Sequence, residues 1–126
     1  MTKPTYQDAE IMLQVSQWGT AMGVQAAMNW MWSDKFIADY TVFREKHPPG
    51  SKGFRRATTV CSWFETIGTL YKNGLFNGDL LFDWLLITGP WERMKGFALG
   101  LREESGAAQL YENFEALAKA QQEWDG

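Results

Sequence analysis

The sequence predicts an all-α protein: a compact single-domain bundle of about six helices with no β-sheet. Over most of the 126 residues, apolar side chains recur at spacings of three and four, which is the period of an α-helix packed on one face. No alternating strand pattern of useful length and no repeat of solenoid period is visible. Because this length is typical of one domain, we expect residues 1–126 to form a single helical domain, with 1–5 and 120–126 frayed.

The first predicted helix begins at Thr5. Its hydroxyl can cap the backbone, and Asp8, three residues later, can reach back to it. One apolar face then follows at helical spacing: Ile11, Val15, Trp18, Met22, Ala26 and Trp30. Gly19 and Gly23 lie near this face and predict the close approach of another helix.

The stretch from 11 to 33 contains 23 residues without a charge, which is long enough to span a bilayer. Amide and hydroxyl side chains interrupt it, and such groups are costly in hydrocarbon. We therefore expect a helix of the protein core and no membrane span. The first residues carry no secretory signal, and a single Cys excludes an intramolecular disulfide, so we expect a cytoplasmic protein.

The later helices are predicted from their start and stop signals. They cover residues 33–47, 54–73, 79–87, 90–104 and 110–118. Pro48-Pro49-Gly50 ends the first of these, Asn73-Gly74 caps the second, and Pro90 suits the first position of a helix. Residues 80–87 are apolar almost all round, which predicts that this helix lies in the centre of the fold.

Residues 63–81 read WFETIGTLYKNGLFNGDLL, and residues 111–117 read YENFEAL. With Trp91-Glu92 and Arg102 between them, these segments resemble the helical domain of unknown function 4760 family over about residues 33–118. The resemblance implies a helical fold, and many members of that family begin with a membrane helix. It implies no activity, cofactor or site residue.

No catalytic or metal-binding motif is present. The sequence lacks the HExxH, GxSxG, GxGxxG and P-loop patterns, and one His with one Cys makes no zinc site. His47 and Cys61 are better interpreted as a helix-capping residue and a buried apolar residue than as a base and a nucleophile. We therefore expect no enzyme, no metal and no cofactor.

Asp83 and Glu92 could belong to a small-molecule or enzymatic site. We keep this as the second alternative to the leading hypothesis, protein–protein contact, which is given at the end of this section. Asp83 interrupts the most apolar run of the chain, where burial would require a partner or a raised pKa. The preferred interpretation places Asp83 on a solvated stripe of its helix. Glu65 is expected to form a structural ion pair with Arg93 or Arg102.

Positive charge is concentrated in residues 44–56. The segment contains one acid, Glu45, and five cations: Arg44, Lys46, Lys52, Arg55 and Arg56. Such a patch suits phosphates, other anions or an acidic protein, although the net charge of −3 argues against a strong nucleic-acid binder. Anion or nucleic-acid binding through 44–56 is the first alternative function. The preferred interpretation pairs the patch with the acidic C-terminal helix, within the chain or across a dimer.

Aromatic residues make up 15% of the chain, and they suggest an interaction surface. A helix cannot bury Trp30, Met31 and Trp32 on one face, so at least one of them is expected at the surface or under a partner. Trp124 follows the last apolar stripe and is a further candidate. The leading hypothesis is a non-enzymatic helical module that acts through protein–protein contacts, with a partner protein or as a homodimer.

Overall fold

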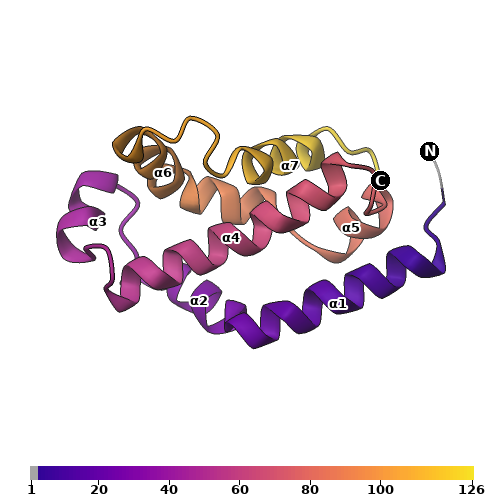
Figure 1. The fold of residues 1–126 in the computed structure, drawn as a ribbon, viewed down its shortest axis with the longest axis horizontal. Coiled ribbons are helices and arrows are strands. Elements are labelled where there is room, and N and C mark those ends of the chain that lie inside the picture. The colour runs from indigo at the N-terminus through magenta and orange to yellow at the C-terminus, as the bar shows by residue number, and fades with distance from the viewer. Residues whose placement is uncertain (1–2) are drawn as a thin grey trace.

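The computed structural model describes residues 3–126, which form seven α-helices and no strand (Figure 1). The helices are α1 (Tyr6–Met22), α2 (Val24–Met31), α3 (Tyr40–Lys46), α4 (Lys52–Lys72), α5 (Gly78–Trp84), α6 (Thr88–Ser105) and α7 (Glu112–Gln122). The predicted all-α class is confirmed, and the expected number of about six helices is close to the number found.

The additional helix arises because the first predicted helix is divided at Gly23. This residue has a φ of 76°, a left-handed conformation that glycine adopts without steric cost, and its N–H donates to the carbonyls of Gly19 and Thr20. The charge-free stretch is thereby shared between α1 and α2. None of the helices within residues 3–126 combines the length and the apolar character that crossing a bilayer requires.

The start of α1 follows the sequence prediction. Asp8 Oδ2 accepts a hydrogen bond from the Thr5 backbone N–H at 2.8 Å, and the Thr5 hydroxyl accepts from the Asp8 N–H at 3.2 Å. Asp8 Oδ1 also accepts from the backbone N–H of Asn77 at 3.1 Å, which ties α1 to the start of α5. The predicted fraying at residues 1 and 2 lies outside the described residues. At the other end, α7 continues to Gln122, which differs from the predicted fraying from residue 120.

Two predicted helices are shorter than expected. The helix predicted from residue 33 begins at Tyr40, capped by Asp39, because residues 33–39 form a loop that places Phe36 in the core. The helix predicted for 79–87 ends at Trp84. There, the Gln121 side chain donates to the Leu85 carbonyl at 2.7 Å and accepts from the N–H of Ile87 at 2.7 Å. The chain is therefore held in an irregular segment over residues 85–87, extended at Leu85, between α5 and α6.

The central helix is α4, so the prediction that residues 80–87 occupy the centre is wrong. In Figure 1, α4 runs the length of the molecule between α1 and α2 on one side and α6 and α7 on the other, while α5 lies at one end. Leu81 and Phe82 of α5 are buried, but Leu86 is 64% exposed. The apolar run of residues 80–87 therefore covers one end of the core and does not form its centre.

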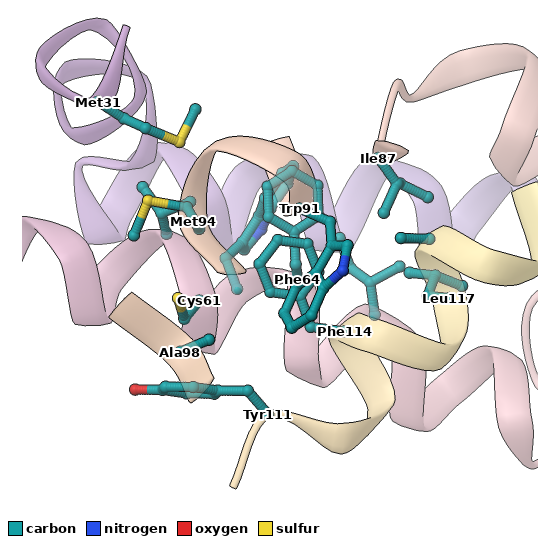
Figure 2. Packing of buried hydrophobic residues seen from close by; sticks show 14 of the residues in the cluster. Met31, Cys61, Phe64, Ile87, Trp91, Met94, Ala98, Tyr111, Phe114 and Leu117 are labelled. Atoms are coloured by element: carbon teal, nitrogen blue, oxygen red, sulfur yellow. The ribbon is translucent and has the colours of Figure 1, made fainter. Parts of the chain in front are cut away.

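Aromatic rings fill the interface between α4, α6 and α7. Figure 2 shows Phe64, Trp91 and Phe114 gathered there; the Phe64 and Phe114 rings stack with centroids 4.7 Å apart. Gly68 of α4 lies against the backbone carbonyl of Asn113, and a Cβ at this position would collide with it. The close approach of α4 and the start of α7 therefore depends on this glycine. Gly19 makes a comparable approach to the Trp63 ring of α4, as the sequence predicts. The close approach predicted at Gly23 is not formed, because, apart from its chain neighbours, no atom of the described residues lies within 4 Å of its Cβ position.

Candidate anion-binding site

Only part of the predicted aromatic interface is at the surface. Met31 is fully buried and Trp30 is 8% exposed, so both are core residues, whereas Trp32 is 53% exposed. Trp124 packs edge-on against Phe82, and its indole N–H donates to Asp79 Oδ1 at 2.8 Å. Of the four candidates, Trp32 therefore remains open to a partner.

The acidic candidates are not brought together. Asp83 is exposed on α5, as the preferred interpretation expects, and Asp79 is engaged by Trp124. Glu92 lies on α6, and its Oε2 is 2.6 Å from the Nζ of Lys95. No group of three or more His, Cys, Asp and Glu side chains within residues 3–126 is arranged to hold a metal ion.

Glu65 and its expected arginine partners have separate structural roles. Glu65 Oε1 accepts from the backbone N–H of Phe114 at 2.9 Å and so caps the start of α7. Arg93 instead donates to the carbonyl of Met31 at 2.8 Å, near the end of α2, and Arg102 forms an ion pair with Glu115 at 3.1 Å. The predicted ion pair between Glu65 and either arginine is not formed.

His47 and Cys61 take the structural roles that the sequence favours. Cys61 is fully buried beside Ala98 (Figure 2), and burial, with a smaller contribution from the charge of Glu65, raises the pKa of its thiol. A thiol held protonated in this way is a poor nucleophile. His47 ends α3, and its ring packs against Phe43, with centroids 5.0 Å apart.

The structure divides the basic segment into two parts. Arg44 Nε is 2.9 Å from Glu104 Oε1 on α6, and that carboxylate also accepts from the Tyr40 hydroxyl at 3.1 Å. The hydrogen bond from Arg44 lowers the pKa of Glu104. The ion pair of Arg44 therefore joins α3 to α6. The other four cations of the segment take no part in this contact.

Three of those cations surround a hollow of about 380 Å³ between α2, the end of α3 and the start of α4. We call this hollow the basic pocket. Its lining consists of Trp30, Lys35, Lys46, His47, Ser51, Lys52, Gly53 and Arg56. Lys35 lies outside the basic segment 44–56 and reaches the pocket through the 33–39 loop, so the sequence does not indicate it as a site residue. No sequence signal within the segment indicates it.

Local backbone geometry builds the wall of the pocket at the start of α4. Ser51 is the N-cap, and its hydroxyl accepts from the N–H of Phe54 at 3.3 Å. Gly53 is buried beneath the imidazole of His47, where a Cβ would collide with the ring. The missing side chain lets the end of α3 lie directly against the first turn of α4, which brings Lys46 and Lys52 to the same pocket.

The charges of the basic pocket are not neutralised within the described chain. The pocket is lined by four cations, Lys35, Lys46, Lys52 and Arg56, and by no carboxylate. None of these four, nor Arg55, forms an ion pair with any residue from 3 to 126. The predicted pairing with the acidic C-terminal helix is thus not formed within the chain.

Arg56 and His47 have further features that matter for a ligand. The guanidinium carbon of Arg56 lies over the Trp30 ring, 5.9 Å from its centroid, and this cation–π contact holds the side chain at the pocket. The Nε2 atom of His47 is buried and has no hydrogen-bond partner within residues 3–126. Buried polar atoms normally have a partner, so this nitrogen is an exception, although it is not exposed to the hollow.

A second hollow, of about 280 Å³, adjoins the basic pocket. Lys52 and Arg56 line both hollows, whereas Arg55 lines only the second. The rest of its wall comes from the junction of α1 and α2 and from α4: Met22, Gly23, Ala26, Ala27 and Thr59. We call it the side pocket. The first turn and a half of α4 therefore forms a basic ridge between two hollows.

Comparison with known proteins identifies the family of the chain and assigns no chemistry to it. The chain matches the domain of unknown function (DUF4760) family over residues 6–124 and belongs to that family. The match is wider than the resemblance seen in the sequence and extends over α1 and α2. No curated protein and no solved structure matches the chain.

Proposed function

We propose that this family member is a non-enzymatic binding module that recognises a phosphate-bearing anion through the basic pocket. The observation that carries the proposal is the convergence of four unpaired cations, from three segments of the chain, on one hollow without a carboxylate. Lysine and arginine side chains gathered in this way are suited to phosphoryl oxygens. A hollow of about 380 Å³ is in the usual size range of small-ligand sites.

The position of these charges on α4 supports the same proposal. The N-terminus of a helix carries a partial positive charge, which favours acidic residues in the first turn and disfavours basic ones. In α4 the first turn contains no acidic residue, and Lys52, Arg55 and Arg56 lie at or next to it. This arrangement costs stability in the free protein. A bound anion would interact favourably with both the helix terminus and the cations.

Binding of inorganic pyrophosphate, measured by isothermal titration calorimetry at fixed ionic strength, tests the proposal. We expect the wild-type protein to bind, and the Lys52→Gln/Arg56→Gln variant to bind at least about tenfold more weakly, because charge-assisted hydrogen bonds are lost. The matched control is Lys72→Gln/Lys119→Gln, which removes two exposed lysines from the C-terminal turns of α4 and α7.

The control variant should bind like the wild type. Absence of binding by the wild-type protein would refute the proposal, and so would an equal loss of affinity in both double variants. The latter result would show that pyrophosphate responds to overall charge and not to this pocket. Affinity should also fall as salt is added, because phosphate contacts are screened.

A second candidate function, contact with another protein, is favoured by the surface around Trp32. Trp32 is 53% exposed and Leu86 is 64% exposed, and both side chains lie within van der Waals range of a Cβ built on Gly89. Exposed apolar side chains that share one patch are typical of interaction sites, including those of homodimers. Sedimentation of the wild-type protein and of Trp32→Ser tests this candidate: a dimer that dissociates in the variant supports it, and a monomeric wild type contradicts self-association.

A further inference from the structure

The ligand of the basic pocket can be narrowed to a chemical class, an inference that rests on the proposed anion-binding function. We propose that the protein binds a linear di- or triphosphate chain that lies across the first turn and a half of α4 and contacts both the basic pocket and the side pocket. The protein contacts the phosphate chain and makes no specific contact with the base or the sugar of any nucleoside attached to it. The shared chemistry is therefore the phosphoric anhydride chain, either free or as part of a nucleotide.

Charge and size favour a chain over a single phosphate. One phosphate group carries about −1.5 to −2 at pH 7, so it neutralises about half of the four cations that line the basic pocket. The hollow, of about 380 Å³, is not confined to the space of a single small ion and leaves room for an extended anion. A second phosphoryl group fits both the unmatched charge and the remaining space.

The shared wall of the two hollows indicates where the chain lies. Lys52 and Arg56 line both hollows, so a phosphoryl group placed beside them has one neighbouring position on each side. Lys46 is available on the basic-pocket side and Arg55 on the side-pocket side. An extended anion beside Lys52 and Arg56 can therefore place one phosphoryl group toward Lys46 and another toward Arg55.

The residues that line the hollows offer little to recognise a base or a sugar. Neither lining contains Asp or Glu, which pair with ribose hydroxyls, or Asn or Gln, which pair with the edge of adenine. The ring of Trp30 is covered by Arg56 and is only 8% exposed, so its face is not open to a stacked base. The polar side chains other than cations are Ser51, His47 and Thr59, each of which suits a phosphoryl oxygen.

Calorimetric titrations at one ionic strength with a panel of probes test this inference. The probes are orthophosphate, pyrophosphate, tripolyphosphate, ADP, adenosine and a 12-nucleotide single-stranded DNA without a terminal phosphate. We expect pyrophosphate and tripolyphosphate to bind at least about tenfold more tightly than orthophosphate, because they engage more charged donors. ADP should match pyrophosphate within about threefold, and adenosine should not bind.

Each outcome separates this inference from the proposed function. If orthophosphate binds as tightly as pyrophosphate, the chain is not recognised, while anion binding stands. If ADP binds more than about tenfold more tightly than pyrophosphate, a base or sugar is read. If the oligonucleotide binds more tightly than tripolyphosphate, the ligand is nucleic acid. If none of the anions binds, the proposed function itself fails.

Two single variants test the placement of the chain. Lys46→Gln removes a cation that lines only the basic pocket, and Arg55→Gln removes one that lines only the side pocket. Arg55→Gln should weaken tripolyphosphate binding by about fivefold or more and leave orthophosphate binding nearly unchanged, whereas Lys46→Gln should weaken both. Tripolyphosphate affinity that is unchanged in Arg55→Gln would overturn the bridging arrangement. Lys72→Gln serves as the charge-matched control, and far-ultraviolet circular dichroism verifies that each variant is folded.

Discussion

Lys52→Glu is expected to stabilise the fold while it weakens anion binding. Lys52 is the first residue of α4, directly after the N-cap Ser51, and its side chain is exposed. The substitution replaces a cation by a carboxylate at the positive end of a 21-residue helix. It also removes one positive charge from a pocket that contains three more. The folded protein therefore gains favourable electrostatics, and a phosphate chain loses a donor and meets a negative charge.

The magnitude of the gain follows from the helix dipole. A charge in the first or last turn of an exposed helix is worth about 0.3–1 kcal/mol at low ionic strength, and a change from lysine to glutamate reverses its sign. The free energy of unfolding should therefore rise by roughly 1 kcal/mol, which for a domain of this size raises the Tm by about 3–5 °C. The gain should shrink as salt is added, because the effect is screened.

The assay is urea and thermal denaturation at low and at high salt, paired with pyrophosphate titration. Lys72→Glu is the matched control: it is the same substitution in the last turn of the same helix, where it should destabilise by a similar amount. A Lys52→Glu protein that is less stable than the wild type at low salt, or that keeps its pyrophosphate affinity, would refute the reasoning. Equal shifts of one sign in both variants would show that net charge, and not position on the helix, is responsible.

Three further predictions concern the fold. Gly68→Ala should lower the free energy of unfolding, measured by urea titration, by about 2–3 kcal/mol. The new Cβ collides with the carbonyl of Asn113, and this cost outweighs the gain of about 1 kcal/mol in helix propensity. A variant as stable as the wild type would contradict this prediction. Hydrogen bonds, chiefly from the Thr5 backbone, lower the pKa of Asp8 in the folded protein. The ionised carboxylate therefore stabilises the fold above about pH 4, and this contribution is lost as the pH falls further. The free energy of unfolding of Asp8→Asn should accordingly fall less than that of the wild type between about pH 5 and 2.5. Cys61 should react with a thiol reagent only as fast as the protein opens, since burial raises the pKa of the thiol; rapid labelling of the native protein would disprove its burial.

The sequence predicts the helices well where local signals define them. The capping box of Thr5 and Asp8, the stop before Pro48 and the cap at Asn73 are short-range features, and the structure has each helix end within a residue or two of them. Such signals depend on hydrogen bonds between residues three or four apart, so they can be recognised without the fold.

The failures of sequence prediction have long-range causes. The helix predicted for 79–87 ends early because the amide of Gln121, which is distant in sequence, binds the backbone at Leu85 and Ile87. No residue within the segment indicates this contact. Its apolar composition predicts burial, but it cannot predict that α4 occupies the centre and that α5 covers one end. Composition gives the amount of apolar surface, and only the packing decides which helix is enclosed.

The candidate site shows the same division between local and long-range information. The basic segment 44–56 is visible in the sequence, yet the structure removes Arg44 from the pocket, because Glu104 pairs with it, and adds Lys35. Both changes depend on contacts that the chain makes with distant residues or through an irregular loop. Charge counting along the sequence therefore locates the pocket approximately: it includes Arg44 and Arg55, which do not line the basic pocket, and it omits Lys35.

The separation of charge within the chain is informative beyond the pocket itself. The protein carries a net charge of −3, so it contains enough acidic residues to neutralise the four cations of the basic pocket. Three of its acidic residues instead form ion pairs with Arg44, Lys95 and Arg102. At the start of α4, where an acid would stabilise the helix most, every charged residue is a cation and lies beside a hollow. If stability alone governed this position, substitution by an acid would be an easy improvement. An unfavourable charge at this helix terminus is therefore what the proposed anion-binding function predicts and what stability alone does not.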